Sequence, residues 1–211
     1  MKNIPILTIL VLIIGACTAA KNPSELIADD QQVKPLATLQ AASCDLAPIE
    51  VPALPSVIPG YTMLDKASGL HMTGKVQVID FSSYRLKVSG LVEQPLSLHY
   101  DDLRCLPKVT ASPKLTCPGF FEDVAQWSGV PIFEVLELAR PQPQARRLSL
   151  ISADGFKVEL DLKNALAPEN FLAYEWEGQP LPVLHGFPLR AVMPGMAGSY
   201  WVKWLVEIKV E

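Results

Sequence analysis

The sequence predicts an α+β domain that is built mainly from short β-strands and contains a few short helices. Short segments in which apolar and polar side chains alternate, such as 85–89 and 157–162, are typical of strands with one buried face. Segment 132–139 instead has the period of a helix and ends before Pro141. Many strands with few helices favour a mixed sheet fold.

The individual elements follow from the same patterns in chain order. Gly90 and Pro95 mark a turn, and Asp101 and Asp102 supply the acidic first turn of a short helix. Asp154 begins an Asp-Gly turn of the kind that joins paired strands. The predicted strands are 75–80, 85–89, 96–98, 148–151, 157–162, 171–176 and 202–210, and the predicted helices are 100–103, 132–139 and 163–166.

The N-terminus has the pattern of an export signal. Lys2 precedes an apolar run over 4–14 that is too short to span a bilayer comfortably, and small residues lead to Cys17. The last four residues of this stretch resemble a bacterial lipoprotein box, which implies that Cys17 carries lipid and is the first mature residue. An ordinary cleaved signal with a chance cysteine is the alternative. Either way we expect an exported protein, and the lipoprotein box implies anchoring to a bacterial membrane on its periplasmic or cell-surface side.

The prediction divides the chain into a signal peptide (1–16), a lipid-anchored proline-rich tether (17–60) and one domain (61–211). Pro48, Pro52, Pro55 and Pro59 would block a helix or a central strand in the tether. We therefore expect an extended, semi-stiff segment there, with its apolar residues either free or lying along the domain.

Charge and cysteine spacing narrow the classes of function. The formal net charge of −4 and the absence of a lysine or arginine block give no support to nucleic-acid binding. The four cysteines form neither a CxxC nor a CxxCH motif, so attachment of a haem is not expected. Cys44 and Cys105 either form a disulfide that pins the tether to the domain or remain two buried thiols.

Three segments carry residues suited to chemistry. Cys117 lies between a short strand and a Pro-Gly turn, where reactive groups are common, although a buried structural cysteine would fit as well. His185 and Arg190 flank a loop fixed by glycine and proline, and Arg190 offers a planar fork suited to phosphate. Lys203 follows a glycine-rich stretch whose backbone N–H groups could approach an anion. Taken singly, each basic residue could equally be a solvated surface charge.

The order of these segments resembles the molybdopterin-binding domain of the sulfite oxidase family, and the compact bacterial type in particular. The resemblance runs from about residue 73 to 210 through LKVSGLVEQPLSL, LTC, WSGVPI, DGF, LAYEWEGQPLP, HGFPLR, VMPG and VKWL. The ten-residue spacing from Cys117 to Trp127 is closer to the periplasmic methionine sulfoxide reductases of this family than to the longer sulfite oxidases.

The resemblance implies a cofactor, a reaction and partners. Cys117 matches the protein ligand to molybdenum and would be the catalytic residue, while His185, Arg190 and Lys203 match positions that hold the pterin and its phosphate. The cofactor would be molybdenum-molybdopterin, and the reaction a two-electron redox step of the oxygen-atom transfer type. A separate electron carrier, either a cytochrome or a quinone-linked subunit, would be needed, with a small-molecule or oxidised side-chain substrate.

Some positions depart from the family pattern. No arginine closely follows Cys117, so sulfite would meet two acids without a nearby guanidinium, and Phe156 stands where sulfite oxidases have a tyrosine. These changes indicate a less polar substrate. His71 and His99 lie outside the matched segments and are expected to be structural or exposed. The alternative function is a cofactor-free surface binding or scaffold module, which Phe156 and a signal without an arginine pair would favour.

Overall fold

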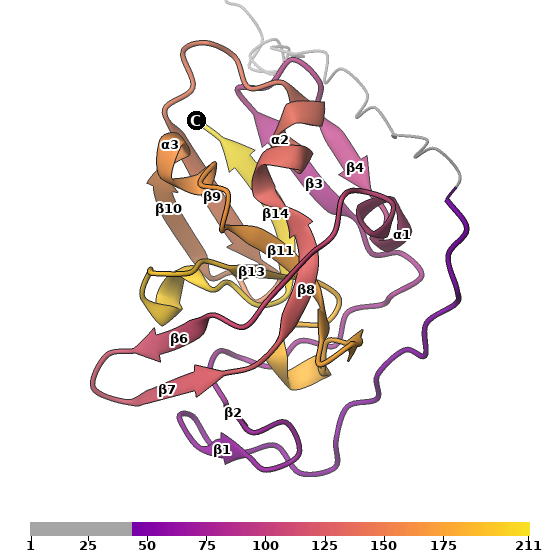
Figure 1. The fold of residues 1–211 in the computed structure, drawn as a ribbon, viewed down its shortest axis with the longest axis vertical. Helices are drawn as coiled ribbons and strands as arrows, with labels where there is room; N and C mark the ends of the chain where they lie inside the picture. The colour runs from indigo at the N-terminus through magenta and orange to yellow at the C-terminus, as the bar shows by residue number, and fades with distance from the viewer. Residues whose placement is uncertain (1–43) are drawn as a thin grey trace, which may run out of the picture. The chain divides into compact units, whose positions relative to one another are not determined.

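The computed structural model describes residues 44–211, and the proposed signal peptide and lipidated Cys17 lie outside this range. A five-stranded sheet has the order β10-β9-β14-β3-β4 (Figure 1). All neighbours in it are antiparallel except β14 and β3, which are parallel. The strands are β3 (Leu86–Gly90), β4 (Leu96–Leu98), β9 (Arg147–Ser152), β10 (Lys157–Asp161) and β14 (Leu205–Val210).

A second five-stranded sheet supplies the other face of the core. Its path is β12-β11-β8-β5, β13 also pairs with β11, and every pair is antiparallel. Side chains of both sheets, among them Val88 and Leu150 of the first and Val130 and Leu172 of the second, belong to one buried apolar cluster. The strands are β5 (Val109–Ala111), β8 (Trp127–Pro131), β11 (Phe171–Trp176), β12 (Gln179–Pro180) and β13 (Arg190–Val192).

Two small hairpins lie beside these sheets. The first pairs β1 (Leu64–Asp65) with β2 (Leu70–His71), and the second pairs β6 (Lys114–Cys117) with β7 (Phe121–Val124). Strands β2 and β7 contact each other, so the two hairpins are neighbours although about fifty residues separate them in the chain (Figure 1). This contact positions part of the site described below.

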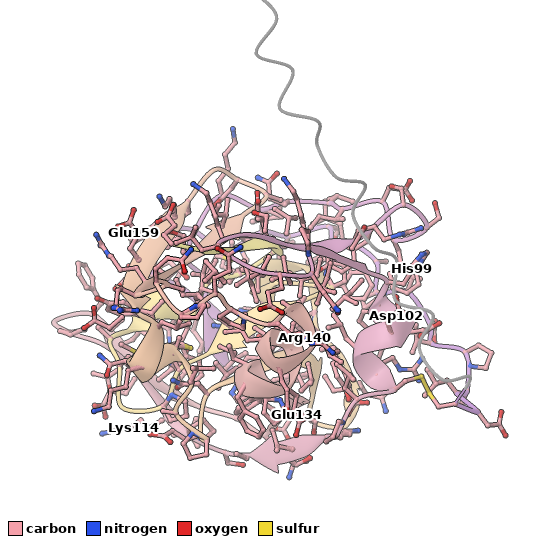
Figure 2. All side chains as sticks on the ribbon, turned by 90° about the horizontal axis from the view of Figure 1, so that it is seen from above. His99, Asp102, Lys114, Glu134, Arg140 and Glu159 are labelled. Carbon is pink, nitrogen blue, oxygen red and sulfur yellow. A yellow bond between two sulfur atoms is a disulfide. The ribbon has the colours of Figure 1, made fainter. Side chains whose placement is uncertain are left out.

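The helices are short, as the sequence predicts. Besides α1 (Tyr100–Arg104), α2 (Ile132–Ala139) and α3 (Leu162–Ala165), the described residues contain two 3₁₀ turns, Val183–His185 and Gly198–Tyr200. His99 precedes α1 and lies exposed, and its backbone N–H donates to the Asp102 carboxylate at 2.7 Å (Figure 2). No helix within residues 44–211 is both long and apolar enough to cross a membrane.

The predicted α+β fold is confirmed, and two of its predicted elements need correction. Residues 75–80 are not a strand: Val76 and Ile79 pack against a small buried cluster, while Val78 is 69% exposed. The apolar residues that pack against the cluster are thus three positions apart, whereas a strand with one buried face would need a spacing of two. The last strand begins at Leu205 instead of residue 202, because Trp204 has a φ of 48° that interrupts extended backbone.

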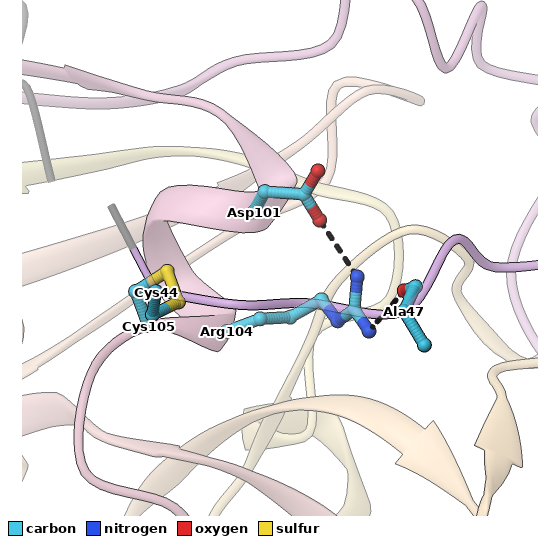
Figure 3. The surroundings of a disulfide bond; sticks show 5 residues. All are labelled: Cys44, Ala47, Asp101, Arg104 and Cys105. Carbon is cyan, nitrogen blue, oxygen red and sulfur yellow. Dashed lines mark hydrogen bonds and ion pairs between the residues drawn. A yellow bond between two sulfur atoms is a disulfide. The ribbon is translucent and has the colours of Figure 1, made fainter. Parts of the chain in front are cut away.

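Residues 44–60 contain no helix or strand, in agreement with the prolines. A disulfide joins Cys44 to Cys105 at the end of α1, with 5.8 Å between their Cα atoms (Figure 3). Beside it, Arg104 donates to the Ala47 carbonyl at 2.9 Å and to Asp101 at 2.8 Å. Of the two alternatives for this cysteine pair, the disulfide is the one observed.

Breaking this disulfide should destabilise the protein. It closes a loop of 61 residues, and a crosslink of that kind stabilises by about 2–4 kcal/mol, chiefly by restricting the unfolded chain. We expect the Cys44→Ser/Cys105→Ser double variant to unfold at lower urea concentration than the oxidised protein. The reduced wild type should match the double variant, and equal midpoints for the oxidised and reduced proteins would contradict the prediction.

Candidate functional site

A cavity of about 290 Å³ lies where the two hairpins meet the loops after β9 and around β13. Cys117, His185, Arg190 and Lys203 all line it, so the four residues proposed from the sequence are brought together. Much of its remaining wall is apolar or aromatic, with Leu70, Leu115, Phe121, Trp127, Phe156, Trp201 and Trp204. Such a wall with a few convergent polar groups is typical of a cofactor or ligand site.

Cys117 is placed by the turn of the second hairpin. It ends β6, and Gly119 takes a φ of 80° in the turn that returns the chain to β7. The neighbouring Thr116 bridges to Ala197, which brings the glycine-rich stretch against the cysteine. Gly198 is close enough that a Cβ there would lie 3.6 Å from the Cys117 Cβ. Cys117 is partly exposed and free of any disulfide, so its thiol is accessible for metal ligation.

Arg190 is buried on β13 with its guanidinium close to two indole rings. The guanidinium carbon lies 4.5 Å from the Trp127 ring centre and 5.8 Å from that of Trp201. It donates to the carbonyls of His185 at 3.1 Å and Trp201 at 3.5 Å, while its Nε has no partner. Burial lowers the pKa of Arg190 to about 9, which still leaves it charged at neutral pH.

Lys203 is the second buried basic side chain of the cavity. Its Nζ donates to the carbonyls of Thr73 at 2.9 Å and Leu184 at 3.1 Å. An ammonium has three N–H donors, so one is left for a ligand. Burial, followed by the charge of Arg190, holds the pKa of Lys203 well below its ordinary value. A bound anion would relieve both effects.

His185 is almost completely buried, with 1% of its surface exposed. Its Nε2 lies 2.8 Å from the Ser68 hydroxyl and 3.0 Å from an Asp65 carboxylate oxygen. Burial and then the charge of Lys203 lower the pKa of His185 to about 3, so the ring is neutral at physiological pH. The β1–β2 hairpin thereby fixes the orientation of this imidazole.

The buried His185 should make the fold sensitive to acid. The unfolded chain takes up a proton near pH 6.5 and the folded chain only near pH 3, so the unfolded state binds more protons in between. Stability should therefore fall as the pH falls through this window, by up to about 1.4 kcal/mol per pH unit. Urea unfolding of wild type, His185→Gln and the exposed-site control His99→Gln measures this. Only His185→Gln should have a shallower slope; an unchanged slope would contradict the assignment.

The cavity has the electrostatics of an anion site. Among residues 44–211 no carboxylate lies within salt-bridge distance of Arg190 or Lys203, although buried charges normally require a partner. The Nε of Arg190 and the indole N–H of Trp201 are also buried donors without an acceptor. These donors and the nearby thiol fit a group that combines a phosphate with a soft, thiolate-binding metal.

The two acids after Cys117 do not both face the cavity. Glu122 is exposed and pairs with Lys114 at 2.9 Å, whereas Asp123 is buried and lines the cavity. Arg190 of β13 lines the same cavity, although it does not closely follow Cys117 in the sequence. Phe156 does line the cavity and is 46% exposed.

Several residues of the cavity wall carry no signal in the sequence. His71 lies outside the matched segments, yet it lines the cavity and bonds Asp123, while His99 is exposed as expected. Asp65 and Ser68 were not recognised as partners of His185, which follows more than a hundred residues later. No local pattern in the sequence marks such contacts. Trp127, Trp201 and Trp204, by contrast, belong to motifs that are visible in the sequence.

Together, the fold and the cavity define a cofactor-binding domain with an anion-binding end and a thiol end. A protein-family model described as "Oxidoreductase molybdopterin binding domain" matches residues 73–211. The chain belongs to this family of oxidoreductases, whose cofactor is molybdenum-molybdopterin.

Similar proteins include members with different activities. A protein of Azospira oryzae, provisionally named a protein-methionine-sulfoxide reductase subunit, is 33% identical over 64% of this chain and 52% of its own length. Sulfite oxidase of Arabidopsis thaliana is 33% identical over 65% of this chain and 44% of its own length. The chain thus spans about half the length of these relatives.

The fold has a counterpart among solved structures. The sulfane dehydrogenase SoxCD from Paracoccus pantotrophus aligns with a TM-score of 0.61, covering 90% of this chain and 59% of the solved chain, at 21% identity. This likeness confirms the sulfite oxidase type of fold that the sequence predicts.

Proposed function

We propose that this protein is an exported, lipid-anchored molybdopterin enzyme that carries out two-electron oxygen-atom transfer, with Cys117 as the protein ligand to molybdenum. The observation that carries the proposal is the pair of buried basic residues, Arg190 and Lys203: they share a cavity with the free thiol of Cys117, and no carboxylate among residues 44–211 lies within salt-bridge distance of either. Such an arrangement is costly unless an anion occupies the cavity.

Each residue has a role that follows from its contacts. Arg190 and Lys203 would hold the phosphate of the pterin through the donors left free by their carbonyl contacts. His185, which is neutral and fixed through Nε2, would hold the part of the cavity wall beside Arg190 in place, because its carbonyl accepts a hydrogen bond from Arg190. Cys117 would ligate the metal, because a thiolate is the protein ligand best matched to soft metal chemistry. The bound cofactor supplies two-electron oxygen-atom transfer.

The chain around the thiol would favour a weakly polar substrate. Phe121 and Phe156 line the cavity, and neither can donate a hydrogen bond. Their rings would exclude water from the substrate and contact its apolar part. A small sulfoxide or an oxidised side chain suits such a wall better than a compact dianion does.

The proposed location and partners follow from the N-terminal sequence and the comparisons. Lipid on Cys17 would hold the enzyme at a bacterial membrane outside the cytoplasm, with residues 17–60 as the tether. Electrons would pass to or from a separate cytochrome or quinone-linked subunit. The name of the Azospira oryzae relative, which is that of a subunit, supports an assembly of this kind.

The test begins with protein purified from its native membrane. We expect about one molybdenum per chain, together with extractable pterin, as the four cavity residues imply. We also expect reduction of dimethyl sulfoxide, methionine sulfoxide or trimethylamine N-oxide with reduced benzyl viologen, at a higher rate than oxidation of sulfite with ferricyanide. Absence of molybdenum, in cells that load other molybdenum enzymes, would contradict the proposal and favour a cofactor-free binding module. A loaded protein inactive with every probe would contradict the oxygen-transfer part.

A further inference from the structure

A second carboxylate–imidazole pair lines the cavity, formed by Asp123 of β7 and His71 of β2. The His71 ring nitrogen Nδ1 lies 2.6 Å from one Asp123 oxygen, and the His71 backbone N–H donates to the other oxygen at 2.8 Å. The His71 ring also stacks on Phe121, with 4.4 Å between ring centres and 10° between planes. One hydrogen bond and one stacking contact therefore fix this imidazole, and the backbone hydrogen bond fixes the Asp123 carboxylate beside it.

The two histidine pairs of the cavity differ in the atom that is engaged. In His185 the nitrogen Nε2 is bonded by Asp65 and Ser68, and the side chain is 1% exposed. In His71 the carboxylate holds Nδ1, Nε2 has no hydrogen-bond partner among residues 44–211, and the side chain is 25% exposed. The first imidazole is thus buried and held through Nε2, whereas the second is partly exposed and keeps Nε2 free of a partner within these residues.

The arrangement of His71 is that of a proton-transferring histidine. A carboxylate on Nδ1 fixes the tautomer that leaves Nε2 as the acceptor, and it stabilises the positive ring that forms when Nε2 takes a proton. Asp123 is 7% exposed and also faces the charges of Arg190 and Lys203. The other titratable groups of the cavity wall are Tyr61, Cys117, Asp154 and His185.

Two other groups of the wall are poorly suited to this role. Phe156 carries no exchangeable proton. Burial raises the pKa of Asp154, but hydrogen bonds from the Phe156 and Lys75 N–H groups and from Ser152 lower it further than burial raises it. Asp154 is therefore an anion at neutral pH and has no proton to give.

We propose that His71, oriented by Asp123, is a catalytic residue that transfers protons through Nε2 during oxygen-atom transfer; this rests on the proposed function. Removing oxygen from a substrate X=O breaks the X–O bond and forms the two O–H bonds of water. The step consumes two electrons, which the electron carrier supplies, and two protons, which His71 passes in turn from solvent. In the oxidative direction the same protons leave by the same route.

The proposal adds to what family membership gives. His71 lies before residues 73–211, which the family model matches, so the dyad joins a segment outside that match to the thiol hairpin. Phe121 connects the two, because it stacks on His71 and pairs with Cys117 across the hairpin. The imidazole is thereby positioned at the same wall as the proposed metal ligand.

The first test reads the proton position directly, independently of turnover. The chain contains three histidines, so spectra of the purified protein with isotope-labelled histidine contain three assignable imidazoles. We expect the neutral His71 ring to carry its proton on Nδ1 and Asp123→Asn to abolish that preference, while the exposed His99 is unchanged. A neutral His71 ring protonated on Nε2 would contradict the proposal.

The second test is kinetic, on holoenzyme with the most active oxygen donor of the panel and reduced benzyl viologen. General acid–base catalysis contributes about 10²–10⁴-fold, so His71→Ala should lower kcat by roughly 100-fold or more at normal molybdenum content, with KM little changed. Added imidazole should restore part of the rate. Asp123→Asn should lower kcat by roughly 10–100-fold, as for other residues that orient a reacting group, and His99→Gln should leave it unchanged.

The outcomes separate this proposal from the function on which it rests. A wild type that lacks molybdenum or turnover contradicts the proposed function, and the role of His71 with it. An active wild type whose His71→Ala variant keeps its rate contradicts only the role of His71. Loss of molybdenum in proportion to activity, with no rescue by imidazole, would make His71 a cofactor-holding residue instead.

Discussion

Replacing Cys117 by serine is expected to abolish oxidoreductase activity and most of the bound molybdenum while the fold persists. Serine offers a hard hydroxyl where a soft, ionisable sulfur is required, and it does so with almost no change in volume. The residue is partly exposed at the end of a hairpin, so little core packing is altered. Metal analysis and the probe assays measure the loss, and thermal unfolding of the metal-free proteins checks that the fold is kept.

The matched control for Cys117→Ser replaces the other two cysteines among residues 44–211, which form the disulfide. Cys44→Ser/Cys105→Ser eliminates the disulfide but leaves Cys117, so it should lose stability and keep molybdenum below its unfolding temperature. A Cys117→Ser protein that retains both molybdenum and full activity would show that the metal is not held through this thiol.

Replacing Gly129 by alanine should destabilise the protein by about 3 kcal/mol, the upper end of the usual cost of overpacking. A Cβ at this position would lie 1.9 Å from the carbonyl oxygen of Leu172 and 2.6 Å from the Ala173 Cα, both backbone atoms of the neighbouring strand β11. Neither can move without breaking the pairing of β8 with β11, on which the second sheet depends. Since the free energy of unfolding of a domain is only about 5–15 kcal/mol, this substitution would remove a large part of it.

Urea unfolding of Gly129→Ala measures this effect against Gly60→Ala. The nearest atom to a Cβ at Gly60 is a flexible side-chain carbon of Met63 at 3.5 Å, so that control should stay within about 0.5 kcal/mol of wild type. Equal stability of the two variants would show that β8 and β11 separate more easily than their close approach indicates.

The sequence predicted those parts of the fold that have a strong local pattern. Helix α2 and strand β11 were predicted with the bounds observed, because apolar periodicity and flanking breakers agree there. Strands β5, β12 and β13 contain only two or three residues, which is too few to show a period. Apolar and polar residues alternate clearly in segment 75–80, yet this segment is a loop whose Val76 and Ile79 pack against the buried cluster that contains Trp204. Here tertiary packing outweighed local preference.

The candidate site was predictable to the extent that its residues belong to recurring motifs. Cys117 and Lys203 were found in this way, and the structure places them in one cavity. The pairing of His71 with Asp123 joins residues 52 positions apart, and that of Asp65 with His185 joins residues 120 positions apart. Such contacts arise from how the first hairpin docks, which depends on the whole fold and not on local spacing.

The parallel pairing of β14 with β3 has a consequence for biosynthesis. It joins Val88 to Ile208 and places the strand nearest the C-terminus between β3 and β9, in the interior of the first sheet. The sheet cannot close while the ribosome still holds residues 205–210, since β3 has no partner on that side until then. Folding of this sheet must therefore wait until residues 205–210 have left the ribosome, and the many long-range contacts of the domain predict that folding is slow.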